Sequence, residues 1–171
     1  MRRDASALAS ARASALLVAA LLLPACAATI TPSPTPRAST PPGLEAIAAS
    51  YVDIVAPFNV ATCEFNTVLS KSAPALSDLK RGSADYVATL ADVIDGLRAA
   101  AWPADLAADA NDLIDALVVD ETHTRAMAAA DTFDSFIAAD DKLIAANSIS
   151  SAASKQLRKD LGLPTGEPPC S

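Results

Sequence analysis

Residues 76–101, LSDLKRGSADYVATLADVIDGLRAAA, carry the pattern that decides the fold. Apolar and small residues recur here at steps of three and four, at Leu76, Leu79, Ser83, Tyr86, Leu90, Ile94, Leu97 and Ala101. Residues at these steps lie on one side of an α-helix, so the spacing predicts a helix that buries one face. The chain also contains 40 alanines, the strongest helix former, whereas runs of alternating β-branched residues typical of strands are scarce.

Three further segments carry apolar stripes, and the first of them follows the same steps of three and four. The first predicted stripe follows Leu44, Ile47, Tyr51, Ile54, Phe58, Thr62, Phe65 and Leu69. The stripe after residue 103 follows Leu106, Ala110, Leu113, Leu117 and Thr124. The last stripe follows Phe133, Phe136, Ile137, Leu143, Ile144, Leu157 and Leu161. All of these side chains are therefore expected to face inward.

Helix ends are expected at residues with capping or breaking properties. Ser72 and Asp131 suit N-cap positions, and Pro103 suits the first position of a helix. Pro57 is expected to kink or split the first helix, and residues 147–151 form a weak patch in the last one. Gly162, followed by a proline, predicts a helix stop.

Four apolar stripes with short connections predict an all-α protein, a four-helix up-and-down bundle over residues 44–163. Residues 164–171 form a C-terminal tail rich in proline. With about 118 residues, the helical part is long enough to bury a substantial core.

The N-terminus reads as an export signal over residues 1–25. Arginines open the chain, and an apolar run over residues 13–23 is too short to span a bilayer. The next residues, Leu23-Pro24-Ala25-Cys26, resemble the lipobox of bacterial lipoproteins. That resemblance implies that Cys26 carries a diacylglycerol and becomes the mature N-terminus, anchored to the outer face of the cell membrane. The alternative is an A-x-A cleavage before Ala28, which would release a soluble secreted protein.

A disordered linker is expected between the anchor and the helices, over residues 26–43. Prolines at positions 32, 34, 36, 41 and 42 favour extended polyproline conformations. Such a segment acts as a semi-rigid spacer of about 3.1 Å per residue. A spacer of this kind is useful when its start is held in a membrane, which supports lipidation of Cys26.

The order of these parts, over residues 1–165, resembles that of small secreted or lipid-anchored proteins of actinobacteria. The residues that carry the resemblance are the alanine-rich signal, the proline-rich tether, "APFN" at 56–59, "AAAWP" at 99–103 and "LRKDLGLP" at 157–164. The resemblance implies a helical-bundle domain and a compartment outside the cytoplasm. These motifs are helix kinks and caps, and they imply no activity.

The chain contains three cysteines, and lipidation of Cys26 would leave two that can form a disulfide with each other. The remaining two, Cys63 and Cys170, are predicted to form a disulfide that holds the C-terminal tail against the first helix. The alternative is a pair of free thiols, with Cys63 packed and Cys170 in a disordered end.

Charge excludes one class of partner. The net charge is −7, and without residues 1–25 the chain keeps 10 basic and 19 acidic side chains, a net of −9. Nucleic-acid binding requires a basic surface, so no nucleic-acid partner is expected. The expected contacts are the membrane, through the lipid on Cys26, and a protein or other component of the cell envelope.

Candidates for catalysis and metal binding are few. The one histidine, His123, follows Asp120 by three residues, a spacing found in di-metal bundles, but a second such pair is missing. His123 also lies away from the predicted apolar stripe, so it is interpreted as an exposed helix residue. The sequence contains no nucleophile elbow and no glycine-rich phosphate loop, and no cofactor is expected.

Two other groups of residues permit a weaker interpretation. Asp105, Asp109, Asp112 and Asp115 are interpreted as a solvated helix face, with cation binding as the alternative. Tyr51, Tyr86 and Trp102 are interpreted as core residues, with the lining of a pocket between helices as the alternative.

The sequence therefore predicts a non-enzymatic, surface-tethered helical bundle that binds a partner or supports the envelope. The alternative is a small-ligand or metal-binding protein with a site between its helices, and a hydrolase ranks third. An exposed apolar patch would favour the partner-binding protein. An enclosed cavity with converging polar groups would favour the ligand-binding protein. His123 beside a nucleophile in a cleft would favour the hydrolase.

Overall fold

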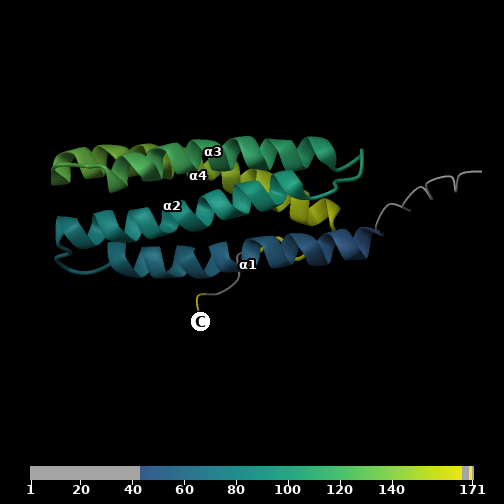
Figure 1. Ribbon diagram of the computed structural model, residues 1–171, viewed down its shortest axis with the longest axis horizontal. Helices are drawn as coiled ribbons and strands as arrows, with labels where there is room; N and C mark the ends of the chain where they lie inside the picture. The colour runs from purple at the N-terminus through teal and green to yellow at the C-terminus, as the bar shows by residue number, and fades with distance from the viewer. Residues whose placement is uncertain (1–42, 167–169, 171) are drawn as a thin grey trace, which may run out of the picture. The chain divides into compact units, whose positions relative to one another are not determined.

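The computed structural model describes residues 43–166 and residue 170 (Figure 1). The predicted signal peptide, the lipidation site at Cys26 and nearly all of the predicted linker lie outside the described residues. The described part is built from four helices, which are α1 (Leu44–Leu69), α2 (Leu76–Ala99), α3 (Ala107–Ala128) and α4 (Phe133–Asp160).

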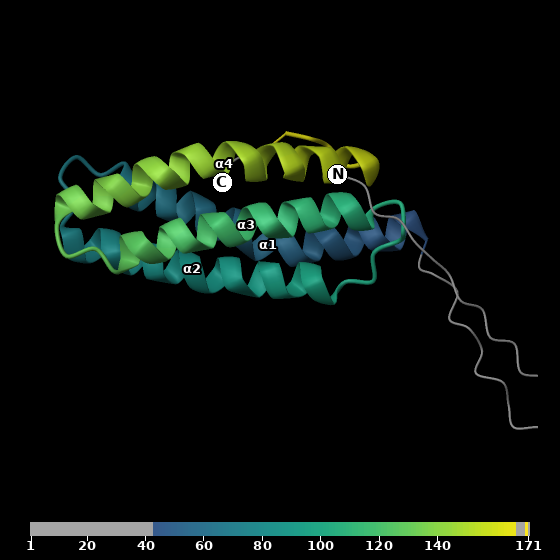
Figure 2. The same ribbon diagram turned by 90° about the horizontal axis from the view of Figure 1, so that it is seen from above.

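Short connections place consecutive helices beside one another in opposite directions (Figures 1 and 2). α1 packs against α2, α2 against α3, and α3 against α4. This arrangement confirms the predicted all-α four-helix bundle. The circuit is not closed, because α4 does not pack along α1 as it packs along α3.

The core consists of two groups of buried side chains, one towards each end of the bundle. The larger group unites α1, α2 and α3 with the end of α4, and it includes Tyr51, Leu90, Leu97, Leu113 and Leu157. The smaller group gathers Phe65, Leu79, Met127, Phe136 and Leu143. Tyr86 is partly buried and contacts both groups.

Two predicted helix starts are wrong by several residues. α2 begins at Leu76 behind an N-cap at Ala75, not behind Ser72. The residue before a proline disfavours helical dihedrals, so Pro74 pushes the start of the helix beyond Ala73. α3 begins at Ala107, because a turn in which the Pro103 carbonyl accepts from the Leu106 and Ala107 amides comes first.

The predicted start of α4 is displaced by one residue. Thr132, not Asp131, is the N-cap, and its hydroxyl accepts from the Ser135 amide at 3.1 Å. The Ser135 hydroxyl accepts from the Thr132 amide at 3.1 Å, so the two residues form a reciprocal capping box. The aspartates one position earlier have the same spacing, and the sequence pattern did not separate the two pairs.

The predicted stop at Gly162 is present, with a left-handed φ of 70°. The Gly162 amide donates to the Lys159 carbonyl at 3.0 Å and the Leu163 amide donates to the Arg158 carbonyl at 2.8 Å, which is the pattern of a Schellman motif.

Neither predicted interruption divides a helix. α1 runs unbroken through Pro57. α4 continues through residues 147–151, where Ser148 donates to the Ala145 carbonyl at 2.8 Å.

Five side chains that were predicted to face inward are exposed. They are Leu44, Ala101, Phe133, Ile137 and Ile144. The last three share one face of α4, at steps of four and seven residues. A closed bundle would cover this face with α1, and the missing α1–α4 packing leaves it open to solvent.

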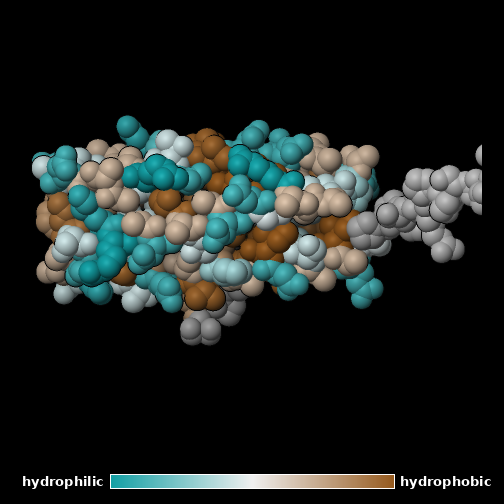
Figure 3. Space-filling view, viewed as in Figure 1, coloured by the Kyte–Doolittle hydropathy of each residue, from teal (hydrophilic) through white to brown (hydrophobic). Residues whose placement is uncertain are grey.

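By length and composition alone, α1 is apolar enough to cross a membrane. Its Ile47, Tyr51, Val55 and Phe65 side chains are instead buried against the other helices, as in a core helix of a bundle. On the face formed by α1, α2 and α3, hydrophilic and hydrophobic residues alternate in small patches (Figure 3).

Candidate functional site

A slot of about 310 Å³ lies between α1 and α4, where the bundle is not closed. We call it the α1–α4 slot. Its lining from α1 includes Tyr51, Phe58, Asn59, Thr62, Phe65 and Asn66. Its lining from α4 includes Asp140, Ile144, Asn147, Ser150, Ser151 and Ser154. Tyr86 of α2 and Leu113 and Leu117 of α3 complete it from behind.

Aromatic rings form one wall of the slot. The Phe65 and Tyr86 rings are stacked, with centroids 4.9 Å apart and planes at 11°. The Phe58 ring also packs against Tyr86, at a centroid distance of 5.4 Å and with its plane tilted by 30°. Three rings from α1 and α2 therefore give the slot a rigid apolar surface with a large contact area.

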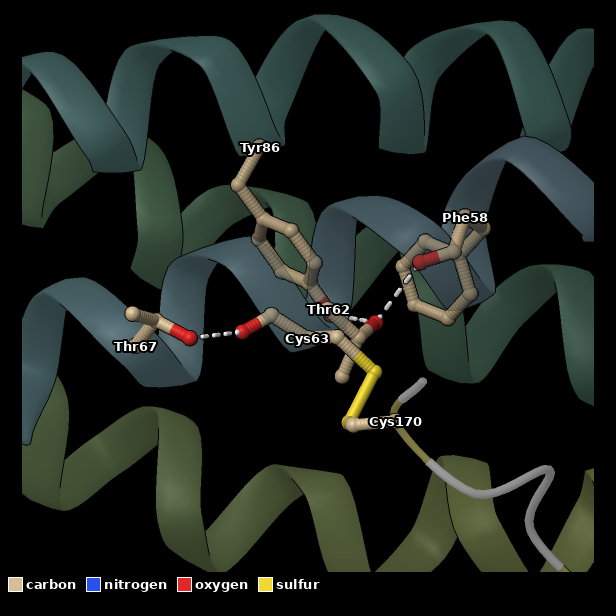
Figure 4. Close-up of a disulfide and its surroundings, with 6 residues drawn as sticks. All are labelled: Phe58, Thr62, Cys63, Thr67, Tyr86 and Cys170. Atoms are coloured by element: carbon tan, nitrogen blue, oxygen red, sulfur yellow. Dashed lines mark hydrogen bonds between the residues drawn. A yellow bond between two sulfur atoms is a disulfide. The ribbon is translucent and has the colours of Figure 1, made fainter.

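Hydroxyl groups are placed along this wall. The Tyr86 ring reaches from α2 to α1, where its hydroxyl lies 3.4 Å from the Thr62 hydroxyl (Figure 4). The Thr62 hydroxyl donates to the Phe58 carbonyl at 2.8 Å. Burial raises the pKa of Tyr86 to about 12, so the phenol stays protonated and available as a donor.

One hydrogen bond crosses between the two helices that flank the slot. The Tyr51 hydroxyl of α1 and the Ser154 hydroxyl of α4 are 3.2 Å apart. Nearby, the Ser150 hydroxyl lies within 3.3 Å of the Asn147 side chain. The slot thus combines an apolar wall with several hydroxyl and amide groups from both flanking helices.

A buried carboxyl group lies behind the slot. Asp120 of α3 is 4% exposed, and its Oδ1 atom has no hydrogen-bond partner among the described residues. Burial raises the pKa of Asp120, whereas a hydrogen bond from Ser150 and the charge of His123 lower it. Ser150 lines the slot, and Tyr86, another lining residue, is close enough for the Asp120 charge to raise its pKa further.

The C-terminal tail covers part of the slot and is bonded to α1. Cys63 and Cys170, both in the slot lining, form a disulfide with a Cα–Cα distance of 5.5 Å (Figure 4). The Arg158 side chain donates to the Pro164 carbonyl at 2.6 Å, which fixes the start of the tail on α4. A disulfide that closes a separation of 107 residues indicates an oxidising environment outside the cytoplasm.

The other sequence candidates lie elsewhere. Trp102 is outside the slot lining; its ring packs edge-on against Tyr51 at 6.5 Å, and its indole donates to the Leu97 carbonyl at 2.8 Å. His123 is half-buried, not exposed as predicted, since α3 is covered by α2 on one side and by α4 on the other. Among residues 43–166 and 170, no three His, Cys, Asp or Glu side chains gather as a metal site around Asp120 and His123 or anywhere else.

Sequence analysis missed the burial of Asp120 and the opening between α1 and α4. A signal for the opening was available in the polar residues of the two flanking helices. Asn59 and Asn66 of α1, and Asn147, Ser151 and Ser154 of α4, stand on faces that a closed bundle would have to bury. A signal for Asp120 was available too, because it lies three residues after Leu117 and four before Thr124, on the predicted apolar stripe.

No family model, no curated protein and no solved structure matches the chain.

Proposed function

We propose that the protein is an exported, surface-tethered helical bundle that binds a small amphipathic ligand in the α1–α4 slot. The slot is the observation that carries the proposal. It unites a wall of stacked rings with hydroxyl and amide groups, and ligand sites combine these two kinds of surface. Its volume of about 310 Å³ lies at the lower end of the usual range for such sites, about 300–1,000 Å³.

The chemistry of the lining defines the ligand class. Phe58, Phe65 and Tyr86 offer flat apolar contacts, which suit a ring or a short hydrocarbon chain. Asn59, Asn147 and Ser151 offer donors and acceptors near the opening, which suit hydroxyl, amide or carboxyl groups.

Anchoring through Cys26 is part of the proposal. It rests on the lipobox-like sequence, on the proline-rich spacer, and on the disulfide as a sign of export. Two acyl chains on one cysteine supply the hydrophobic area that stable membrane attachment requires. A tethered bundle would hold a captured ligand close to the membrane surface.

Native mass spectrometry of the protein purified from cell envelopes tests ligand binding. The intact protein should carry an added mass that is lost on unfolding. Replacing the slot-lining Ser154 by Phe should remove this mass, because the ring fills the slot. Ser148→Phe is the matched control, since Ser148 is exposed on the same helix outside the lining. A wild-type protein without added mass, or equal loss in both variants, would contradict the proposal.

Fractionation tests the anchor separately. Cys26→Ser should move the protein from the membrane fraction to the soluble fraction and leave its helical circular dichroism unchanged, because the linker separates the anchor from the bundle. A wild-type protein that is already soluble and begins at Ala28 would refute lipidation and leave the slot proposal intact.

A further inference from the structure

A second concave surface lies on the other side of α4, between α4 and α3. This α3–α4 groove has a volume of about 570 Å³ and is lined on α3 by Asp109, Asp112, Asp115, Ala116 and Val119. On α4 it is lined by Ala146, Ile149, Ala152, Ala153 and Gln156. The two helices lie side by side along this surface (Figure 2). None of these residues belongs to the α1–α4 slot.

The floor of the groove is apolar and open. Val119 of α3 is 46% exposed and Ile149 of α4 is 65% exposed. Alanines at 116, 146, 152 and 153 lie between them, and their short side chains leave room for an incoming side chain. Two large aliphatic side chains facing solvent above a row of alanines form a surface suited to the apolar face of a helix.

The rim of the groove is negatively charged on the α3 side. Asp109, Asp112 and Asp115 follow one another at steps of three, so each carboxylate lies about 4.5 Å further along the helix axis. The ion pairs of the described residues are Arg81–Asp78, Arg98–Asp95 and Arg125–Glu121, and they leave these three aspartates without a basic partner. The groove lining itself contains no lysine or arginine.

Carboxylates crowd one another at the end of this rim. Partial burial, then the neighbouring Asp160 of α4 and the charge of Asp112, raise the pKa of Asp109. After burial, the charges of Asp160 and Asp112 contribute to this rise, so three carboxylates lie close together at this end of the groove. An incoming ammonium or guanidinium group would relieve this repulsion.

Charge also decides between possible occupants. A second copy of the chain is a poor occupant, because each mature copy carries a net charge of −9. A basic partner gains from both the local rim and the overall field. The groove runs from residue 109 to residue 119 on α3, about 15 Å, which matches three turns of a helix.

We propose that the α3–α4 groove binds a basic amphipathic helix of a partner protein. The aliphatic face of that helix covers Val119 and Ile149, and its lysines or arginines, spaced at three and four residues, meet Asp112 and Asp115. This site is independent of the ligand slot, so the protein can present a ligand and hold a partner at the same time.

A designed peptide provides the probe. A helical peptide of about 14 residues made of leucine and lysine, with the lysines along one edge, should bind the full exported protein. The same peptide with glutamate in place of lysine should not bind. Calorimetry at low and moderate salt should show affinity falling as ionic strength rises, because the ion pairs are exposed.

Substitutions in the groove locate the site. Asp112→Asn with Asp115→Asn should weaken binding about tenfold, since two exposed ion pairs are lost. Asp53→Asn with Asp92→Asn is the matched control, because it changes the net charge equally on exposed positions of α1 and α2. Ile149→Ser should also weaken binding about tenfold, and Ile137→Ser, another exposed isoleucine of α4, should not.

Three outcomes would overturn the proposal. They are equal binding of the acidic peptide, equal weakening by the control pair, and peptide-induced NMR shifts at slot residues such as Ser154 in place of shifts at Val119 and Ile149. Shifts confined to the groove together with an empty slot in native mass spectrometry would uphold this inference and refute the ligand proposal alone.

Discussion

The α2–α3 contact and the α1–α4 contact join helices of similar length in different ways. Between α2 and α3, fully buried leucines and isoleucines such as Leu90, Leu97 and Leu113 pack directly. Between α1 and α4, hydroxyl and amide side chains face each other across a slot, beside the core side chains that both helices contribute. One hydrogen bond and the disulfide-bonded tail add to this connection. The first contact rests on apolar burial, and the second depends also on a covalent bond.

The difference follows from what each contact would have to bury. Removing an amide or hydroxyl group from water without a new partner costs about 1–3 kcal/mol. Closing α4 onto α1 would bury Asn59, Asn66 and Ser151 at once, so the helices stay apart. The disulfide joins α1 to the tail that follows α4, while the slot between the two helices stays open.

Removing the disulfide should have the largest effect. The Cys63→Ser and Cys170→Ser variants, and the reduced wild-type protein, should each lose about 2–4 kcal/mol of unfolding free energy, below the chain-entropy ceiling of about 4.7 kcal/mol for a loop of this length. Urea unfolding followed by circular dichroism measures the loss. Hydrogen exchange should accelerate in α1 and α4 before it does in α2 and α3. An unchanged urea midpoint would show that the tail is not needed to hold the slot.

The next largest effect should come from truncating a core side chain, and it should distinguish the α2–α3 contact from the α1–α4 contact. Leu90→Ala removes a fully buried side chain of α2 and should cost about 3 kcal/mol. Ile144→Ala, on the slot side of α4, should change the unfolding free energy by less than about 0.5 kcal/mol, because the side chain is 65% exposed. If both variants lost the same amount in urea unfolding, the slot would be closed in solution.

The same contrast explains which parts of the structure the sequence predicted. Periodicity identified all four helices, and most of the stripe residues it selected in α2, such as Leu79, Leu90 and Leu97, are buried. It failed for Phe133, Ile137 and Ile144, because a stripe reports an apolar face and does not report whether a neighbouring helix covers it.

Helix starts were harder to predict than helices. Residues with capping ability occur close together, and the choice among them depends on details of a single turn. Thr132 and Ser135 cap each other's amides, whereas Asp131 offers the same spacing one position earlier. The alternative of a pocket between helices named Tyr51, Tyr86 and Trp102, of which only the two tyrosines line the slot. The position of the slot was not predicted, since the approach of α4 to α1 depends on contacts far apart in the sequence.

Asp120 should give a smaller, pH-dependent effect. A carboxyl whose pKa is raised by folding binds its proton more tightly in the folded state, so it lowers stability as pH rises above the unfolded pKa. Asp120→Asn removes the buried charge and should raise the unfolding free energy at about pH 7 by on the order of 1 kcal/mol.

Thermal unfolding at several pH values measures this effect. The gain from Asp120→Asn should shrink as the pH falls through the raised pKa of the wild-type carboxyl, because protonation then removes the buried charge. Asp92→Asn, an exposed change on α2, serves as the control and should show no such trend. A gain that is the same at every pH would mean that the charge on Asp120 carries no penalty in the fold.

Two glycines of α2 give the smallest effect and test how closely α1 and α2 approach. A Cβ atom at Gly82 would lie 3.4 Å from the Val68 side chain, an ordinary contact, whereas at Gly96 it would lie 3.0 Å from Ile54 Cγ2. Replacing glycine by alanine inside a helix stabilises it by about 0.5–1 kcal/mol. Gly82→Ala should realise this gain, and Gly96→Ala should fall short of it, because the Ile54 side chain has to move. Equal gains in urea unfolding would mean that α1 is as loosely held by α2 as it is by α4, and the contrast between the two sides of α1 would fail.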